Sequence, residues 1–317
     1  MSLLPSPALE AESILWITFG VAVIGMLAID LGLHRRAHAL SAKESAIWSS
    51  VWIAVAGGFN VLVYLSMGHE KASEFLVGYV LEKSLSIDNM FIFILIFSSL
   101  NIPSAYQPKI LKWGIIGALL MRAILIFVGA SLLETFHWMI YVFGVIIMAT
   151  GARMIIQKEK KIHPERNPLV RLARKILPVT STTHGEKFFV TLNGVRYATP
   201  LWLALLVVET TDLIFAVDSI PAIFAITSDL FIVYTSNIFA ILGLRALYFL
   251  LANIMQMFSY LKVGLSVILF FIGIKMVLSD VYKISIEISL LVIFGILGFS
   301  ILLSFFRKGA NINNQGK

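Results

Sequence analysis

Residues 207–227 read VVETTDLIFAVDSIPAIFAIT, and they set three acidic side chains, Glu209, Asp212 and Asp218, inside an otherwise apolar run. A run of about 20 apolar residues is long enough to cross the roughly 30 Å hydrocarbon core of a bilayer as a helix. A charged side chain at the centre of such a helix costs about 2.5–3.5 kcal/mol, so it needs a partner or a polar cavity. The stretch therefore predicts a transmembrane helix that carries a polar site.

A second stretch, EKSLSIDNMFIF at residues 82–93, repeats the same spacing of an acid, five residues, an aspartate and a small polar residue. The helices that follow are also alike, since GALLMRAILIF (117–127) aligns with AILGLRALYFL (240–250). We therefore predict a three-helix unit that occurs twice. Because three is odd, the second copy enters the membrane in the opposite sense, which is a recurrent design of transporters with a substrate site near the midplane.

The whole chain has the composition of a polytopic membrane protein. Of its 317 residues, 59% are hydrophobic and only 14% are charged, too few charges for the surface of a soluble protein of this size. Nine apolar runs are expected to span the membrane as helices, at 12–33, 44–66, 74–99, 110–133, 136–156, 199–226, 230–251, 260–278 and 285–306. The chain thus divides into 1–73 (two N-terminal helices), 74–156 (first repeat), 157–198 (basic loop), 199–280 (second repeat) and 281–317 (last helix and tail).

The basic loop predicts the orientation of the chain. It holds nine basic and three acidic residues, a net charge of +6 out of the formal +7 of the chain. The positive-inside rule places such a loop in the cytoplasm, and its charge suits contact with anionic lipid heads without nucleic-acid binding. Five spans precede it, so we expect the N-terminus outside and the C-terminus in the cytoplasm. The first eleven residues contain no Lys or Arg, so they do not read as a signal peptide.

The buried charges do not balance. Five acids lie in the spans (Glu82, Asp88, Glu209, Asp212 and Asp218), against three bases that can balance them (Lys83, Arg122 and Arg245). A divalent cation would neutralise the remaining charge of −2. Two other interpretations stay open: the acids pair with the bases only to lock helices together, or one or two of the carboxylic acids are protonated.

Other groups extend the candidate metal site. Residues six apart on a straight helix cannot share one ion, but Asp88 and Asp218 can meet across the axis between the repeats. Asn89 and Ser219 offer further oxygen ligands or, equally, hydrogen bonds between helices. Pro221 predicts a helix break that frees a carbonyl four residues earlier.

All these candidate ligands are oxygen atoms, whereas there is no cysteine and the six histidines fall at helix ends or in loops. Such ligands suit Mn²⁺, Mg²⁺ or Ca²⁺. No disulfide or thiolate metal site can form, and no residues suggest an organic cofactor.

Residues 82–93, 207–227 and 234–252 (YTSNIFAILGLRALYFLLA) resemble the TerC family of integral membrane proteins, and within it the Alx-type members are the most similar. The resemblance covers roughly residues 70–280. It implies manganese export, a LysE-like inverted-repeat fold and the link to tellurite resistance through which the family was first described. It also implies a place in the bacterial inner membrane. The acidic motif residues of the family fall on the five buried acids named above.

The leading hypothesis is a secondary exporter of Mn²⁺ driven by proton exchange, because the chain has no GxxxxGK[ST] phosphate loop to bind ATP. An alternative is a membrane partner of the secretion machinery that delivers metal to secreted proteins, with the basic loop as its docking surface. A third hypothesis, an intramembrane protease with an Asp88–Asp218 dyad, lacks the expected GxGD signature, so we do not expect an enzyme. The oligomeric state is left open, a homo-oligomer included.

Overall fold

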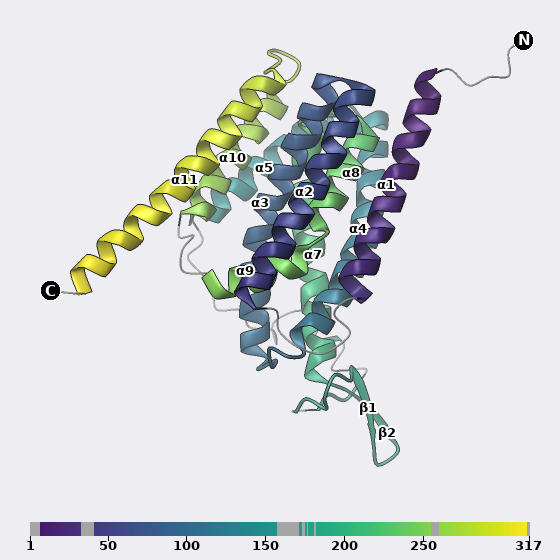
Figure 1. The fold of residues 1–317 in the computed structure, drawn as a ribbon, viewed down its shortest axis with the longest axis vertical. Helices are drawn as coiled ribbons and strands as arrows, with labels where there is room; N and C mark the ends of the chain where they lie inside the picture. The colour runs from purple at the N-terminus through teal and green to yellow at the C-terminus, as the bar shows by residue number, and fades with distance from the viewer. Residues whose placement is uncertain are drawn as a thin grey trace, which may run out of the picture.

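The computed structural model describes residues 7–32, 41–156, 182–254 and 260–315, together with 171, 172, 175 and 177–180. The elements are α1 (Pro7–Gly32), α2 (Ala42–Met67), α3 (His69–Ser99), α4 (Gln107–Thr135), α5 (Met139–Ile156), β1 (Phe189–Leu192), β2 (Val195–Ala198), α7 (Pro200–Phe224), α8 (Leu230–Ile241), α9 (Leu244–Ile254), α10 (Leu261–Val277) and α11 (Ile286–Gln315). The helices form one bundle, with α1 and α11 at opposite edges (Figure 1).

Helix α3 lies at the centre of the bundle, where it contacts α2, α7, α8, α9 and α11. The helices of the two predicted repeats exchange partners: α3 packs along α8, and α4 packs along α7. The third helices of the two units, α5 and α10, pack along each other. A pseudo-twofold axis between two inverted units would produce this exchange.

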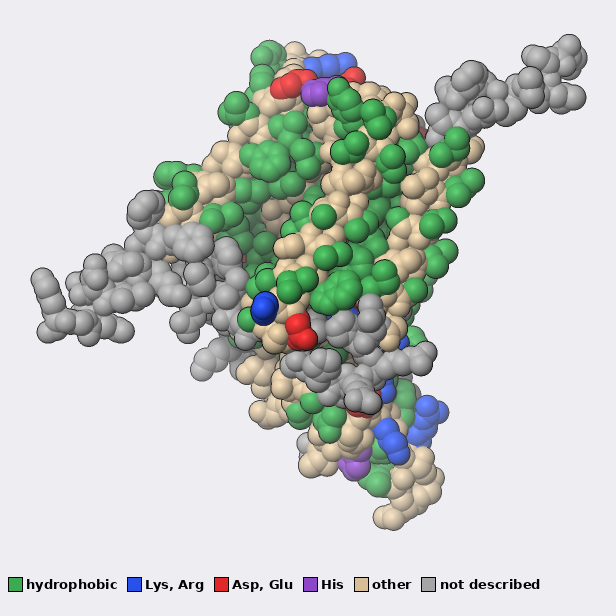
Figure 2. Space-filling model, viewed as in Figure 1, with side chains coloured by type: hydrophobic (Ala, Val, Ile, Leu, Met, Phe, Trp, Pro, Cys, Tyr) green, Lys and Arg blue, Asp and Glu red, His purple; other side chains and the backbone are tan. Residues whose placement is uncertain are grey.

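The outward faces of the helices are apolar, as a lipid-facing surface requires. Leu65 is 73% exposed and Leu291 is 76% exposed, and apolar side chains follow the helices over the visible face of the bundle (Figure 2). Inside, aromatic side chains such as Phe59, Phe75 and Phe239 pack together between α2, α3 and α8. The molecule is therefore a helical, multi-pass membrane protein.

In the described part of the chain, five helices are by themselves long and apolar enough to cross a membrane: α1, α2, α4, α7 and α11. The pair α8 and α9, bent by 44°, counts as a sixth span if its two halves cross together. Helix α3 carries Glu82, Lys83 and Asp88 in its middle part, while α5 and α10 are short. All nine predicted spans coincide with helices, but the number of nine crossings stays a prediction.

The sequence predicts a helix break near Pro221, but the structure has its break between α8 and α9. Helix α7 continues through Pro221 to Phe224, because a proline one turn from the end of a helix removes a single ladder hydrogen bond. The straight helix predicted at 230–251 is instead divided at Leu242 and Gly243. Gly243 has a φ of +81°, in the left-handed region that favours glycine.

The basic loop contains a β-hairpin that the sequence analysis does not predict. Strands β1 and β2 pair antiparallel, with Leu192 opposite Val195, and the turn is Asn193–Gly194 with φ values of 51° and 79°. Positive φ at both residues is the signature of a tight hairpin turn. The hairpin projects beyond the helices at one end of the bundle (Figure 1), which we call the hairpin end.

Candidate functional site

A buried arginine joins the two predicted repeats. The guanidinium of Arg122, on α4, donates hydrogen bonds to Glu82 of α3 and, at 3.5 Å, to Asp212 of α7. It also donates to the hydroxyl of Ser219 at 3.4 Å and to the amide oxygen of Asn237 at 3.1 Å. All five side chains are buried. We call them the Arg122 network.

The network is not fully satisfied. Among the residues that the structure describes, Oδ2 of Asp212 and Nε of Arg122 find no hydrogen-bond partner, although Asp212 is only 5% exposed. A buried carboxylate oxygen without a partner is costly, and a bound ion or water is an ordinary reason for one. The Oδ2 atom of Asp212 is therefore the atom of the Arg122 network that is best placed to bind a cation.

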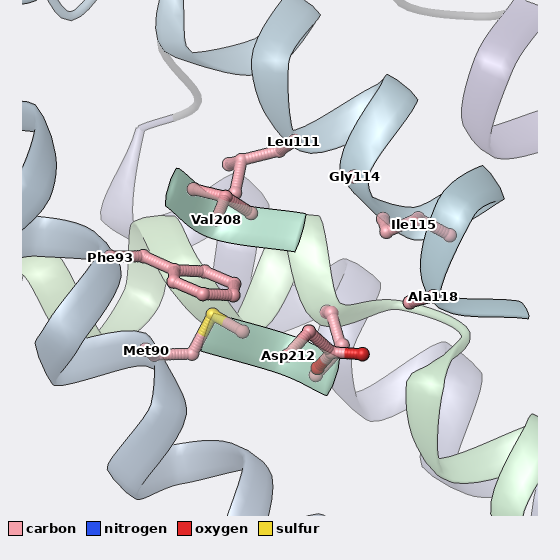
Figure 3. Close-up of a pocket in the computed structure, with 9 residues that line it drawn as sticks. Met90, Phe93, Leu111, Gly114, Ile115, Ala118, Val208 and Asp212 are labelled. Atoms are coloured by element: carbon pink, nitrogen blue, oxygen red, sulfur yellow. The ribbon is translucent and has the colours of Figure 1, made fainter. Parts of the chain in front are cut away.

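Asp212 lies at one end of a narrow cavity. Figure 3 shows Met90 and Phe93 of α3 on one side of it and Leu111, Gly114, Ile115 and Ala118 of α4 on the other. The cavity has a volume of about 20 Å³, room for about one water molecule. Its remaining lining residues, Val208 and Leu244, lie on α7 and at the start of α9. Since the lining residues of α3, α4 and α7 come from the halves of those helices toward the hairpin, the cavity approaches Asp212 from the hairpin end.

Glu209 lies one turn from Asp212 on α7, nearer the hairpin end. It packs against the backbone of α4, since a Cβ atom added at Gly117 would collide with the Glu209 carboxylate. The glycine therefore makes room for a half-buried acid beside the Arg122 network. Glu209 and Asp212 face the same side of α7, as their spacing of three residues predicts.

Asp88 and Asp218 face a different part of the bundle. Asp218 accepts a hydrogen bond of 3.0 Å from Thr150 of α5 and lies in the field of Arg153. Asp88 lies in the field of Lys262, at the start of α10. Both are partly exposed toward α5 and α10, and Asn89 is buried beside Asp88.

The seven predicted ligands are therefore not gathered around one point. Glu82, Asp212 and Ser219 meet at Arg122, Glu209 lies beside them, and Asp88 and Asp218 lie apart toward α5 and α10. Within the residues that the structure describes, no three Asp, Glu or His side chains come close enough to hold one metal ion. The metal ligands assigned from the sequence stay a prediction.

The three predicted charge-balancing bases have different partners. Arg122 contacts two of the five acids, as described. Lys83 instead donates to the carbonyls of Ala240 (3.0 Å) and Leu242 (3.3 Å), where the break between α8 and α9 frees them. Arg245 pairs at 3.0 Å with Asp30 of α1, an acid that lies outside both repeats.

Sequence reasoning missed two buried members of these networks. Asn237 is uncharged, and a single amide in the run FIVYTSNIFAIL does not stand out, although polar residues in apolar helices are often interhelical hydrogen bonders. Asp30 lies near the end of its helix, where a charge is ordinarily solvated. The signal for Asp30 was Arg245 itself, a base inside an apolar helix that needs an acidic partner.

The chain is similar to known membrane proteins along most of its length. The family model described as "Integral membrane protein TerC family" matches residues 67–311. An "Uncharacterized membrane protein STKORF319" of Myxococcus xanthus is 51% identical over 295 residues, which cover 93% of this chain and 92% of that protein. The "Putative membrane-bound redox modulator Alx" of Escherichia coli (strain K12) is 48% identical over 301 residues, 92% of this chain and 94% of that protein. No solved structure matches.

Proposed function

The chain belongs to the integral membrane protein TerC family, and from this premise we propose that it is a secondary transporter that exports a divalent metal ion, Mn²⁺, from the cytoplasm in exchange for protons. The observation that carries the proposal is the buried Oδ2 atom of Asp212, which no described residue hydrogen-bonds, at the end of a cavity in a network that joins both repeats. Ionisable groups inside a membrane domain mark substrate and ion pathways.

In the proposed mechanism Arg122 occupies the site of the metal ion when no ion is bound. The guanidinium occupies the space between Glu82 and Asp212 and keeps two carboxylates from facing each other without a cation. A divalent ion that reaches Asp212 through the cavity competes with Arg122 for the same oxygen atoms. Protonation of carboxylates from the other side then releases the ion, and Arg122 returns.

The proposed topology follows from the basic loop. With nine crossings, the hairpin end would be cytoplasmic, and the cavity would then lie on the cytoplasmic side of Asp212. The exchange of partners between α3–α8 and α4–α7 supports an inverted repeat. Rocking of one repeat against the other would then expose the site alternately to the two sides.

The choice of Mn²⁺ rests on the family resemblance, because the oxygen ligands suit Mg²⁺ and Ca²⁺ as well. The test is uptake into inside-out vesicles that contain the purified protein, with the three ions compared while internal pH is followed. Uptake of Mn²⁺ with loss of internal protons is the expected result. Binding without uptake would overturn the transport proposal.

Three variants test the site in the same vesicles. Asp212→Asn should abolish uptake, and so should Asp88→Asn and Asp218→Asn if the acids toward α5 and α10 are also on the ion path. Thr211→Val is the matched control, because the Thr211 hydroxyl bonds only the carbonyl of Val207 in its own helix among the contacts of the structure. Full uptake by Asp212→Asn at equal protein level would exclude Asp212 from the site.

A second candidate function is a metal-delivery partner of the secretion machinery. The observation that favours it is the hairpin, which projects from the bundle and presents Arg196 and the half-exposed Val195. Deletion of residues 160–195 separates the two functions. If metal uptake survives the deletion, the result supports a transporter. If the variant still binds metal but no longer delivers it to secreted proteins, the result supports a metal-delivery partner. A redox role, as in the printed name of the Escherichia coli relative, would have to work without thiols, since the chain has no cysteine.

A further inference from the structure

Asn237 touches both charged members of the central ion pair. Its Oδ1 accepts a hydrogen bond of 3.1 Å from Nη1 of Arg122, and its Nδ2 donates one of 3.3 Å to Oε2 of Glu82. The side chain is fully buried. An amide carries no charge, so Asn237 adds nothing to the charge balance of the network and acts only through its oxygen and nitrogen.

The neighbours of Asn237 show that this contact is particular to it. The hydroxyls of Thr235 and Ser236 are also fully buried, but they donate to carbonyls of their own helix, at Phe231 and Ile232. Among these three side chains, the amide of Asn237 is the one that hydrogen-bonds to side chains of α3 and α4.

Helix α8, which carries Asn237, is held at both of its ends. Asp229 caps its start by accepting hydrogen bonds from the backbone N–H groups of Phe231 and Ile232. Lys83 of α3 binds the carbonyls of Ala240 and Leu242 at its end. The amide is therefore presented to Glu82 by a fixed helix.

We propose that Asn237 is a ligand of the transported ion, and this inference rests on the proposed function. When the ion displaces Arg122 from Glu82, the amide oxygen loses its donor and binds the ion together with Glu82 and Asp212. Two carboxylates neutralise a divalent ion, and the amide adds a third oxygen without further charge.

The distances allow this exchange. Two oxygen atoms that bind one ion at about 2.2 Å and at right angles lie about 3.1 Å apart. The Nδ2 atom of Asn237 lies 3.3 Å from Oε2 of Glu82. A rotation of the amide by half a turn puts Oδ1 at that place, at a distance close to the spacing that Asn237 and Glu82 need to bind one ion.

The test is a Mn²⁺ titration of the purified protein, followed by the paramagnetic signal of the free ion, with Asn237→Ala, Asn237→Asp and Thr235→Val compared with the unaltered chain. Asn237→Ala should weaken Mn²⁺ binding at least about tenfold, the lower end of what loss of a supporting group at a metal site costs. Asn237→Asp, nearly the same in shape, should tighten binding and slow uptake into vesicles, because a third carboxylate holds the ion more firmly. Thr235→Val should bind as the unaltered chain does.

Melting temperatures measured without metal separate a ligand from a merely structural residue. A structural role would lower the melting temperature of the Asn237 variants and leave Mn²⁺ affinity unchanged, and that result overturns the inference. Because Asn237→Asp keeps the size of the side chain, unchanged affinity in this variant is decisive even if Asn237→Ala does not fold. If the unaltered chain itself shows no saturable binding of Mn²⁺, Mg²⁺ or Ca²⁺, the proposed function fails instead.

Discussion

At the scale of single residues, Arg122 is the group whose loss should be felt most. Removal of one partner of a buried ion pair leaves an uncompensated charge and typically costs about 3–5 kcal/mol. Arg122→Met leaves Glu82 and Asp212 facing each other without their shared cation. We expect a large fall in the melting temperature of the detergent-solubilised protein.

The double variant Arg122→Met with Glu82→Gln should recover part of that loss, since the amide removes the charge that Arg122 had balanced. Thermal unfolding of the two variants side by side measures the recovery. Equal melting temperatures would mean that the charge of Glu82 is not what destabilises the Arg122→Met variant.

Gly117 gives a second prediction at this scale. Gly117→Ala places a methyl group where the Glu209 carboxylate lies, so the carboxylate must move. We expect slower Mn²⁺ uptake with little change in stability, because Glu209 is half-buried and can turn outward. Gly58→Ala is the control, since a Cβ atom there meets open space. Unchanged uptake in Gly117→Ala would remove Glu209 from the ion path.

The residues of the site divide into those that a sequence reveals and those that only a structure reveals. A charged side chain in an apolar helix is energetically costly, so the sequence alone identifies Glu82, Arg122 and Asp212 as candidate site residues. Their grouping depends on how the helices rotate and cross, which the apolar pattern of lipid-facing helices does not determine. For this reason the sequence does not show that Asp88 and Asp218 lie toward α5 and α10.

At the scale of elements, the bend between α8 and α9 depends on one glycine. Gly243→Ala puts a side chain at φ +81°, which costs of order 1–3 kcal/mol, and its Cβ atom would also collide with the ring of Trp52. We expect a lower melting temperature and lower uptake, because the bend presents Ala240 and Leu242 to Lys83.

Addition of Trp52→Leu to Gly243→Ala tests this account. The double variant should recover the part of the stability that the collision removes but not the part that the backbone strain removes. A Gly243→Ala variant that is as stable as the unaltered chain would contradict it.

The end of the bundle opposite the hairpin is closed by polar contacts between elements. Lys71, at the start of α3, pairs with Glu74 at 2.9 Å and with Asp229 at 3.1 Å, and Thr227 donates to Glu74 at 2.6 Å. Burial lowers the pKa of Lys71, but its hydrogen bonds with Glu74 and Asp229 outweigh this effect and raise the pKa above 10.5.

A raised lysine pKa adds stability that is fully present below the unfolded pKa and is lost as the pH rises through the folded pKa. We therefore expect these contacts to hold at neutral pH and to weaken only above pH 10.5. The difference in melting temperature between the unaltered chain and Lys71→Met, measured against pH, should shrink in that range. A difference that shrinks already near pH 8 would show that the pKa of Lys71 is not raised.

Two elements show what local sequence signals can and cannot decide. Asn193–Gly194 between FVTL and VRYA is a strong hairpin signal, although it lies within a loop whose most prominent feature is its positive charge. Proline is a strong signal for a helix break, but Pro221 lies in the last turn of α7 and does not interrupt the helix. The true break at Gly243 follows from packing against Trp52, a residue nearly 200 positions earlier in the chain.

At the scale of the whole molecule, an ion pair ties α1 to the bundle. Helix α1 lies at the edge, and the family model, which begins at residue 67, does not include it. Asp30 of α1 nevertheless binds Arg245 of α9 in the interior. Asp30→Asn should therefore lower the amount of folded protein in the membrane.

The exchanged pair, Asp30→Arg with Arg245→Asp, should restore more folded protein than either single change does, since it returns opposite charges to the same place. Western blots of membranes and thermal unfolding measure both effects. If the exchanged pair is no better than the single variants, the contact does not hold α1 by charge.

The same ion pair sets a condition on how the chain is made. Asp30 and Arg245 are 215 positions apart, and at about 5–20 residues per second a ribosome needs about 10–40 s to bridge that distance. During this interval α1 has already been synthesised, but Arg245, to which Asp30 binds in the folded protein, has not. The N-terminal helix is thus the first to be made and, through Asp30, among the last to reach its final contacts.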